Sequence, residues 1–334
     1  MKIAQPYLLF LGDVTDPLSA KTARGILKWR PQSCIGQIRL TEETVSLDLP
    51  EYSLQQAKDE GVKTLVIGTA NSGGIIPDSW KQTLIQAAEM GFDIASGMHQ
   101  RLSDIVELVK LKEEKGIQLF DVRHYDDQLK VGTGKKRSGK RLLTVGTDCA
   151  VGKMFSALAI EKALNENNIQ ARFKATGQTG ILIEGSGISV DAVVSDFISG
   201  AVEAISPEFS DHDWDVIEGQ GSLFNPSFAG VSLGLLHGAQ PDAIVLCHEI
   251  GRKHIRNLPH ADLPSIEDTI STNLQAARVT NPNVTIVGVC LNTSAISLED
   301  AKTLCADWSE KYQIPVTDPV RFSVKSIVEK VAAL

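Results

Sequence analysis

The sequence predicts an α/β protein built on two parallel sheets, and three observations lead to this prediction. Short apolar runs alternate with amphipathic segments along both halves of the chain, which is the order of strands and helices in a parallel sheet covered on both faces. A basic, glycine-rich segment with almost no apolar side chains interrupts the alternation at 126–140. With 334 residues, the chain is also long enough for two domains, each with its own core.

The first half, 1–125, contains five apolar runs that are typical of buried strands. Between them lie four segments with apolar residues at helical spacing, and Gly61, Gly91 and Gly116 stand where three of these helices are expected to end. This order predicts a Rossmann-like domain, whose ligands collect at the carboxyl ends of its strands. We expect strands at 6–12, 34–40, 63–68, 92–96 and 117–122, and helices at 19–29, 52–61, 79–91 and 102–116.

The alternation resumes after the basic linker, 126–140, and predicts a second α/β domain over 141–334. The stretch FKATGQTGILIEG (173–185) is expected to leave its strand through a flexible turn that carries Lys174 and Gln178. We expect strands at 141–146, 169–175, 214–219, 242–248 and 284–292, and helices at 153–168, 266–279, 298–312 and 324–334.

The stretch GTDCAVGK (146–153) follows a predicted strand and opens a predicted helix, which is the setting of a phosphate-binding loop. The first N–H groups of a helix have no partner within it, the glycines let the backbone close around an anion, and Lys153 adds a cation. The spacing is G-x5-G-K, one residue longer than the usual G-x4-G-K. We therefore predict a P-loop NTPase-like domain. Its cofactor-binding residues are expected to be Gly146, Thr147, Asp148, Cys149, Ala150, Val151, Gly152, Lys153 and Met154, with Lys174 from a neighbouring strand.

Met154 occupies the position at which nucleotide hydrolases and kinases place a hydroxyl that binds Mg²⁺. A thioether is a soft ligand and does not suit this hard cation. Ser156 lies two residues further on, so it points to another side of the predicted helix. The loop is thus expected to hold phosphates that serve as a handle rather than as a reactant, without a metal ion.

The composition excludes several classes of partner. A net charge of −8 with only 5% aromatic residues disfavours nucleic acid and anionic membranes, and no apolar run is long enough to span a bilayer. The five cysteines are scattered and odd in number, which favours reduced thiols and a cytoplasmic protein. The histidines of HEIGRKH (248–254) are six residues apart, not the four that two zinc ligands on one helix face need. An acidic α/β enzyme of this size is commonly a symmetric homo-oligomer.

Two resemblances follow from these motifs. GTDCAVGKM with FKATGQTG resembles the phosphate loop and lysine strand of dethiobiotin synthetase, an ATP-dependent carboligase with a threonine at the position of Met154. Nearly the whole chain, including GTANSGG (68–74), SGMHQRLSD (96–104) and VIEGQGSLFNPSF (216–228), resembles the DgcN-type D-glutamate N-acetyltransferases, formerly a domain of unknown function. This second resemblance implies acetyl transfer from acetyl-CoA, as co-substrate, to the amine of D-glutamate.

Acyl transfer to an amine needs a base, donors for the carbonyl oxygen and aligned reactants. Glu218, at a predicted strand end, is the expected base; a structural carboxylate held by loop N–H groups is the alternative. Lys153, Asp148 and His248 are the other expected catalytic residues, with Asp148 orienting Lys153 or the amine. Cys149 offers a rival covalent route, because a helix start lowers thiol pKa values. Donors to the glutamate carboxylates are expected from Lys21, Arg24, Asn71, Ser72, Arg101 and Gln178.

Two other functions are consistent with the motifs. An ATP- and magnesium-dependent ligase or kinase of the dethiobiotin synthetase type would release ADP, which Met154 argues against. A nucleotide sensor would bind its ligand without turnover.

Overall fold

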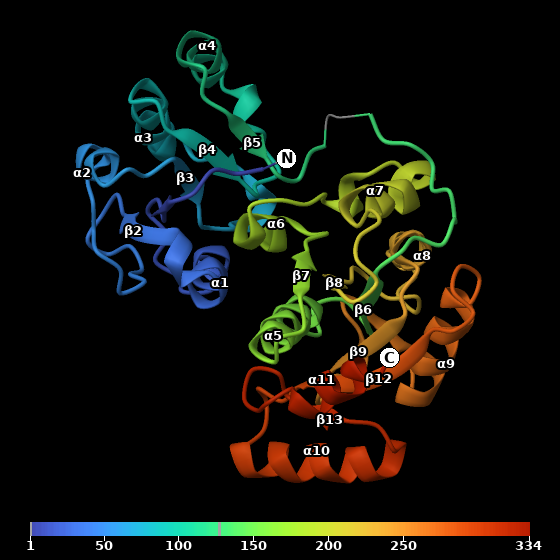
Figure 1. Cartoon of the computed structure of the whole chain (residues 1–334). Helices are drawn as coiled ribbons and strands as arrows, with labels where there is room; N and C mark the ends of the chain where they lie inside the picture. Colours follow the sequence, from blue (N-terminus) through green and yellow to red (C-terminus); the bar gives the residue numbers. More distant parts are fainter. Residues whose placement is uncertain (1, 126–127) are drawn as a thin grey trace. The chain divides into compact units, whose positions relative to one another are not determined.

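The computed structural model describes residues 2–125 and 128–334, which form two compact α/β units (Figure 1). The first unit holds the chain up to residue 126 together with the segment Gly177–Ala192, and the second holds 127–176 and Val193–Leu334. The prediction of two α/β domains with parallel sheets is confirmed. The chain thus passes from the second unit back to the first for sixteen residues before it returns.

The sheet of the first unit has five parallel strands in the order β2-β1-β3-β4-β5. The chain reverses its direction of winding between β1 and β3, so the carboxyl ends of these two strands form a topological switch point. Its strands are β1 Tyr7–Phe10, β2 Cys34–Ile38, β3 Thr64–Ile67, β4 Asp93–Ser96 and β5 Leu119–Asp121. Its helices are α1 Lys21–Trp29, α2 Leu54–Asp59, α3 Asp78–Glu89, α4 Val106–Lys115 and α6 Gln178–Glu184.

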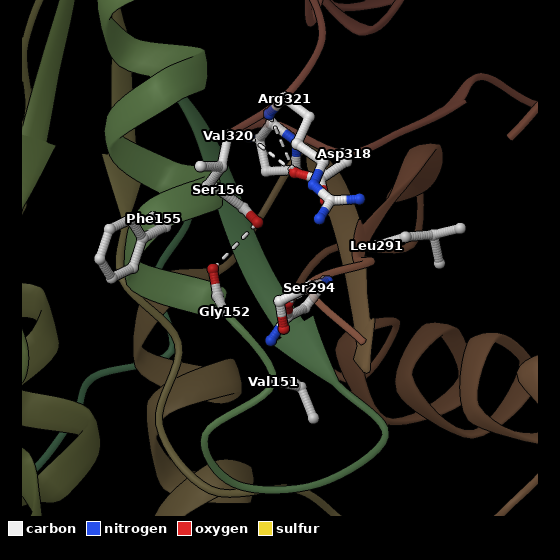
Figure 2. A pocket seen from close by; sticks show the side chains of 11 residues that line it. Val151, Gly152, Phe155, Ser156, Leu291, Ser294, Asp318, Val320 and Arg321 are labelled. Atoms are coloured by element: carbon white, nitrogen blue, oxygen red, sulfur yellow. Dashed lines mark hydrogen bonds between the residues drawn. The ribbon is translucent and has the colours of Figure 1, made fainter. Parts of the chain in front are cut away.

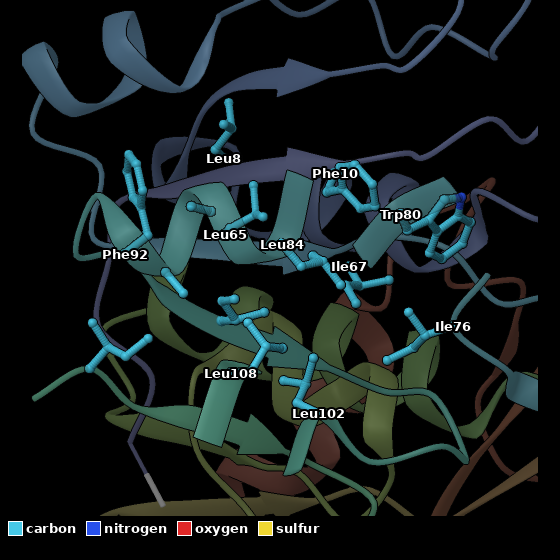
Figure 3. Close-up of a cluster of buried hydrophobic side chains, with 14 of the residues drawn as sticks. Leu8, Phe10, Leu65, Ile67, Ile76, Trp80, Leu84, Phe92, Leu102 and Leu108 are labelled. Carbon is cyan, nitrogen blue, oxygen red and sulfur yellow. The ribbon is translucent and has the colours of Figure 1, made fainter. Parts of the chain in front are cut away.

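The core of this unit lies between the sheet and helices α3 and α4 (Figure 3). Phe10 of β1 meets Trp80 of α3 edge to face, with ring centroids 5.4 Å apart, and both side chains are buried. The indole N–H of Trp80 donates to Asp13 Oδ1 over 2.8 Å, so the polar edge of the ring is satisfied. Gly116 ends α4 in the left-handed conformation, with φ of 71°, as its position in the sequence predicts.

The segment 177–185 differs from the prediction. We expected a flexible turn in the second domain, but the residues form α6 and belong to the first unit. Apolar residues explain the difference, because Ile181, Leu182 and Ile183 are fully buried. Arg30 and Glu184 also join α1 to α6 through an ion pair of 2.9 Å.

The sheet of the second unit has six parallel strands in the order β13-β12-β9-β6-β8-β7. A separate antiparallel hairpin, β10–β11, follows β9. The strands are β6 Lys140–Gly146, β7 Ala171–Lys174, β8 Trp214–Ile217, β9 Ala243–Glu249, β10 His254–Ile255, β11 Leu258–Asp262, β12 Thr285–Asn292 and β13 Val316–Thr317. The helices are α5 Lys153–Glu166, α7 Ile198–Ile205, α8 Ala229–Ala239, α9 Ile266–Ala277, α10 Leu298–Tyr312 and α11 Lys325–Ala332.

Serine side chains start three of the helices. Ser53, Ser265 and Ser297 each accept a hydrogen bond from the backbone N–H three residues on, and so cap α2, α9 and α10. Among the described residues, single turns of 3₁₀-helix also occur at Pro31–Ser33, Ser72–Gly74, Leu102–Asp104, Val190–Ala192 and Ser195–Phe197.

The basic segment before β6 packs on the second unit. Arg137 is 8% exposed, and its guanidinium donates to the main-chain oxygen of Ser206 over 2.8 Å. Lys136 pairs with Asp242, just before β9, over 2.7 Å. These cations therefore lie at the amino ends of the strands, whereas the loop after Gly146 lies at the carboxyl ends.

Candidate functional site

The loop between β6 and α5 has the backbone of an anion site. It leaves the centre of the sheet at Gly146 and enters the helix at Lys153. Ala150 and Gly152 take positive φ angles of 55° and 101°. Such an angle is uncommon for a residue that carries a Cβ, as Ala150 does. The N-terminus of α5 has no side-chain cap, which leaves its first N–H groups directed at the loop.

Lys153 lies on the inside of this loop. The residue is 7% exposed, and its Nζ donates to the main-chain oxygen of Asp148 over 2.8 Å. Burial lowers the pKa of Lys153, while the charge of Glu218, among others, acts in the opposite direction. Gly146 makes room for this side chain, since a Cβ there would lie 3.1 Å from Nζ. Lys153 is thus a buried cation held at the place predicted for phosphate binding.

Asp148 is a fully buried carboxylate that fixes the loop from outside. It accepts hydrogen bonds from Asn225 Nδ2 over 2.9 Å, from Arg252 over 2.9 Å and from the Arg256 backbone N–H over 2.6 Å. Burial alone would raise the pKa of Asp148, but these hydrogen bonds together lower it. The main-chain oxygen of Asp148, not its carboxylate, contacts Lys153.

His248 ends β9 beside the loop. Its Nδ1 lies 3.1 Å from the hydroxyl of Thr147, which is fully buried, and its ring packs against Trp308 with centroids 5.7 Å apart. Burial and the neighbouring charge of Arg252 lower the pKa of His248 to about 4. His248 is therefore neutral at pH 7 and holds Thr147 in place.

Glu218 follows β8 and lies close to Lys153. It is 4% exposed, and its Oε2 accepts a hydrogen bond from the backbone N–H of Thr176 over 3.0 Å. The next residue, Gly219, packs so closely that a Cβ would overlap the main-chain oxygen of Thr144 and lie 3.1 Å from Cδ of Lys153. The carboxylate thus follows β8 and the ammonium lies on the helix that follows its neighbour β6.

Lys174 points away from the loop. Its Nζ lies 3.7 Å from the carboxylate of Asp215, which is fully buried and also accepts from Arg172 over 3.0 Å. Asp215 pairs in register with Arg141, near the start of β6, whereas the loop follows the end of β6. The Lys174 ammonium therefore pairs with Asp215, toward the amino ends of the strands and away from the loop.

The hydroxyl and thiol groups near the loop have other partners. Ser156 donates to the main-chain oxygen of Gly152 over 3.0 Å and lies 3.3 Å from the sulfur of Cys247, so its hydroxyl faces the core. Met154 is half-buried at the position after the lysine. Burial raises the pKa of the Cys149 thiol even though Lys153 acts in the opposite direction, which works against a thiolate there.

A pocket of about 280 Å³ opens beside the loop (Figure 2). Val151 and Phe155 line it from the loop and α5, Leu291 lines it from the end of β12, and Val320 lines it from the segment after β13. The carboxylate of Asp318 accepts hydrogen bonds from the backbone of Val320 and from Thr293, so it is fully engaged. Polar atoms at the wall also come from Asn292, Ser294 and Arg321. Apolar walls with a few polar groups are typical of small-molecule sites.

The predicted substrate residues lie in the first unit, and all except Gln178 are on segments that follow its strands. Loops 68–74 and 97–101 leave adjacent strands, and Gln100 donates its backbone N–H to Gly74 over 2.9 Å. Gln178, at the start of α6, packs against Gly97, where a Cβ would lie 3.3 Å from its side chain. The segments that carry Asn71, Arg101 and Gln178 therefore meet at the carboxyl edge of the sheet.

The individual side chains differ in how they are engaged. Lys21 and Arg24 are exposed on the first turn of α1, and neither has an ion-pair partner among the residues described by the structure. The Asn71 amide bonds to both the N–H and the oxygen of Ile75, so it holds its own loop. Arg101 is half-buried. Ser72 lies outside the described side chains.

Three residues of the site were not expected from the sequence: Asn225, Arg252 and Arg256. Arg252 donates to Asp148 and to the main-chain oxygen of Cys149, and it also pairs with Glu249. The cluster of cations in GRKHIR (251–256), directly after a buried strand, is a signal that predicts such a role. Asn225 carried no comparable signal, because its contact with Asp148 spans 77 residues.

Over residues 2–125 and 128–334, no group of three His, Cys, Asp or Glu side chains is arranged to hold a metal ion. Nδ1 of His254 instead lies 3.1 Å from Oδ1 of Asp262, within the hairpin. In the same described ranges, no helix has the length and apolar character needed to cross a membrane.

Comparison with known proteins extends these findings to the whole chain. Residues 38–125 match a domain of unknown function described as DUF1611_N, Rossmann-like domain, and residues 130–328 match DUF1611_C, P-loop domain. A protein of Pseudoalteromonas sp named D-glutamate N-acetyltransferase is 50% identical over 98% of this chain and 99% of its own length. A protein of Tritonibacter scottomollicae with the same name is 47% identical over 99% of this chain and 100% of its own.

A solved structure agrees with both matches. The crystal structure of a DUF1611 family protein from Anabaena variabilis superposes with a TM-score of 0.84 at 32% identity, over 99% of this chain and 100% of the other. Both the predicted resemblance and the predicted acyltransferase activity are confirmed by these relatives. The chain therefore belongs to the DUF1611 family, with a Rossmann-like N-terminal domain and a P-loop C-terminal domain, and it is an acyltransferase.

Proposed function

We propose that this protein transfers the acetyl group of acetyl-CoA to the amine of D-glutamate. The observation that carries the proposal is the identity of 50% and 47% to two proteins named D-glutamate N-acetyltransferase, over at least 98% of the chain. In this reaction the amine nitrogen attacks the thioester carbon, the C–S bond breaks, and coenzyme A leaves as the thiol. The amine gives up its protons on the way, so a base is needed.

We propose that the loop from Gly146 to Met154 holds the phosphates of coenzyme A. These phosphates take no part in acyl transfer, so the loop needs a cation and backbone donors but no magnesium ligand. Lys153 supports this role through its burial inside the loop, and Met154 supports it by replacing the hydroxyl. The pocket bordered by Val151 and Leu291 has apolar walls suited to the adenine ring of the same molecule.

For the amino acid, we propose the carboxyl edge of the sheet in the first unit. The glutamate carboxylates need charge-assisted donors, and cations come from two segments, Lys21 and Arg24 on α1 and Arg101 after β4. Asn71 and Gln178 add amide groups from the loop after β3 and the start of α6.

Glu218 is our candidate for the base that accepts the amine proton. It is buried at a strand end beside Lys153, and one of its oxygens accepts a hydrogen bond from Thr176. Asp148 and His248 act through the loop instead, because Asp148 anchors it by three hydrogen bonds and His248 positions Thr147. The raised pKa of Cys149 favours direct transfer over an acetyl-cysteine intermediate.

The test is to mix the protein with acetyl-CoA and D-glutamate and to follow the release of free thiol, with L-glutamate in a parallel reaction. Thiol release that depends on D-glutamate is the expected result. A parallel reaction with ATP and Mg²⁺ tests the ligase or kinase, which requires ADP formation. Ligand binding without turnover in either reaction would instead identify a sensor.

Variants locate the two substrates. Lys153→Ala should raise the KM for acetyl-CoA by about 10- to 100-fold, the equivalent of one charge-assisted contact. Lys162→Ala is the matched control, since Lys162 is exposed on the same helix. Arg101→Ala should raise the KM for glutamate and leave acetyl-CoA binding intact. Cys149→Ala should retain transfer, and a labelled acetyl-protein that vanishes in this variant would establish the covalent route.

We also propose that the protein works in the cytoplasm as a homo-oligomer. The scattered cysteines are free in the structure, which suits a reducing compartment. Light scattering of the purified protein measures its assembly state.

A further inference from the structure

The hairpin β10–β11 presents a cation at its tip and is rigidly attached beside the loop. Ile255 is 2% exposed and pairs with Leu258 across a two-residue turn formed by Arg256 and Asn257. Asn257 takes a positive φ of 66°, a conformation in which asparagine is several-fold enriched. At the base of the hairpin, Leu263 donates its N–H to Lys253 over 2.9 Å. Backbone pairing and a buried side chain therefore hold the two strands of the hairpin together.

The backbone of Arg256 is bonded to the loop, but its side chain is not. The Arg256 N–H donates to Oδ2 of Asp148 over 2.6 Å, which fixes this residue next to the loop. The side chain is exposed, and its guanidinium has no hydrogen-bond or ion-pair partner within the described parts of the chain. The charges of Lys153, Arg256 and Arg252 all act on the Cys149 thiol and oppose the effect of burial on its pKa. An unpaired cation thus stands at the loop.

The segment that leads into the hairpin passes the pocket. Ile250, directly after β9 and four residues before the hairpin, donates its N–H to the main-chain oxygen of Asn292, which lines the pocket. In coenzyme A the ribose joins the adenine to the diphosphate and also carries a 3′-phosphate. A ligand with its adenine in the pocket and its diphosphate on the loop would place this ribose at their shared border, Val151 and Gly152, on the same loop that Arg256 joins through Asp148.

We propose that Arg256 binds the 3′-phosphate of acetyl-CoA and makes the site select coenzyme A over nucleotides that lack this group. The inference rests on the proposed function. A guanidinium forms paired hydrogen bonds with a phosphate, which a lysine does not. A local cation is also needed, because the chain carries a net charge of −8 and Lys153 is already engaged inside the loop. The guanidinium of Arg321, at the pocket wall, already donates to the main-chain oxygen of Ile296 over 2.9 Å.

The experiment compares acetyl-CoA with acetyl-3′-dephospho-CoA as acetyl donors for the unaltered protein, Arg256→Ala and Lys253→Ala. Arg256→Ala should raise the KM for acetyl-CoA by about 10- to 100-fold and leave that for the dephospho donor within about twofold. Lys253→Ala is the matched control, since Lys253 is exposed on the same hairpin. Its KM values should match those of the unaltered protein.

The outcomes separate this inference from the proposed function. Transfer from neither donor by the unaltered protein would refute the proposed function and the inference with it. If the unaltered protein transfers acetyl but Arg256→Ala affects both donors equally, Arg256 contacts the diphosphate and only the inference fails. The inference also fails if Arg256→Ala leaves both KM values unchanged. It fails as well if Lys253→Ala has the same selective effect, because the general positive charge of the hairpin, rather than a contact of Arg256, would then explain the preference for acetyl-CoA.

Discussion

Replacement of Asp148 by asparagine should destabilise the second unit. The Asp148 carboxylate accepts three hydrogen bonds, from Asn225, Arg252 and the backbone of Arg256. An asparagine amide keeps the bond to Asn225 but places an NH₂ group against the other two donors. A hydrogen bond to a charged group contributes about 1.5–3 kcal/mol, and Arg252 keeps its contacts with Cys149 and Glu249. We therefore expect a loss of about 3 kcal/mol, near the lower limit for two such bonds.

Urea unfolding of Asp148→Asn measures this loss, and thermal unfolding should show a midpoint lowered by about 6–12 °C. The effect also depends on pH. Because the folded pKa of Asp148 is below the unfolded value of about 3.9, its stabilisation is present above that pH and is lost as the pH falls through the folded pKa. In Asp148→Asn this part of the acid dependence should vanish. Asp262→Asn is the control, since that side chain is 91% exposed.

The reasoning would be refuted by an Asp148→Asn protein within about 0.5 kcal/mol of the unaltered one, which is the usual range for surface substitutions. An unchanged loss of stability in acid would refute it as well, because the ionised carboxylate would then make no net contribution.

Three further substitutions test other parts of the second unit. Gly219→Ala should lower both thermal stability and the rate of thiol release, since its Cβ would overlap the oxygen of Thr144; unchanged values for both would contradict this packing. The pKa of His248 is about 4 in the folded protein and about 6.5 in the unfolded chain, so the free energy of unfolding should fall by about 2 kcal/mol between pH 7.5 and pH 5. In His248→Asn this fall should be absent, and urea unfolding midpoints at the two pH values measure it. Arg141→Met should cost about 3–5 kcal/mol in urea, because it removes a fully buried guanidinium beside Asp215; Lys140→Met, at the half-buried start of the strand, is its control.

The sequence predicted the two sheets and the loop well, because both depend on local order. Buried strands appear as apolar runs, and the loop appears as glycines and a lysine between a strand and a helix, so β6, residues 146–153 and α5 are all found where expected. The end of α4 at Gly116 was predicted for an equally local reason, because glycine adopts the left-handed conformation of a helix end without strain.

Other features depend on contacts between distant parts of the chain. The contact of Asp148 with Asn225 could not be predicted, because it spans 77 residues and nothing near Asn225 signals it, whereas the cations at 252–256 are visible in the sequence. The environment that raises the pKa of Cys149 is likewise a result of packing, whereas the sequence showed only its position before a helix. The segment 177–185 was misread as a turn because its glycines are visible in the sequence, while the surface that buries Ile181 is not.

The excursion of residues 177–192 into the first unit has a consequence for how these proteins can be divided. A fragment that stops at residue 125 would lack α6, and the face of α1 next to Ile183 and Thr179 would lie bare. The complementary fragment would carry that helix with nothing to cover it. The two halves are therefore interlaced through the backbone, so neither is expected to be exchanged, truncated or inherited as an independent module.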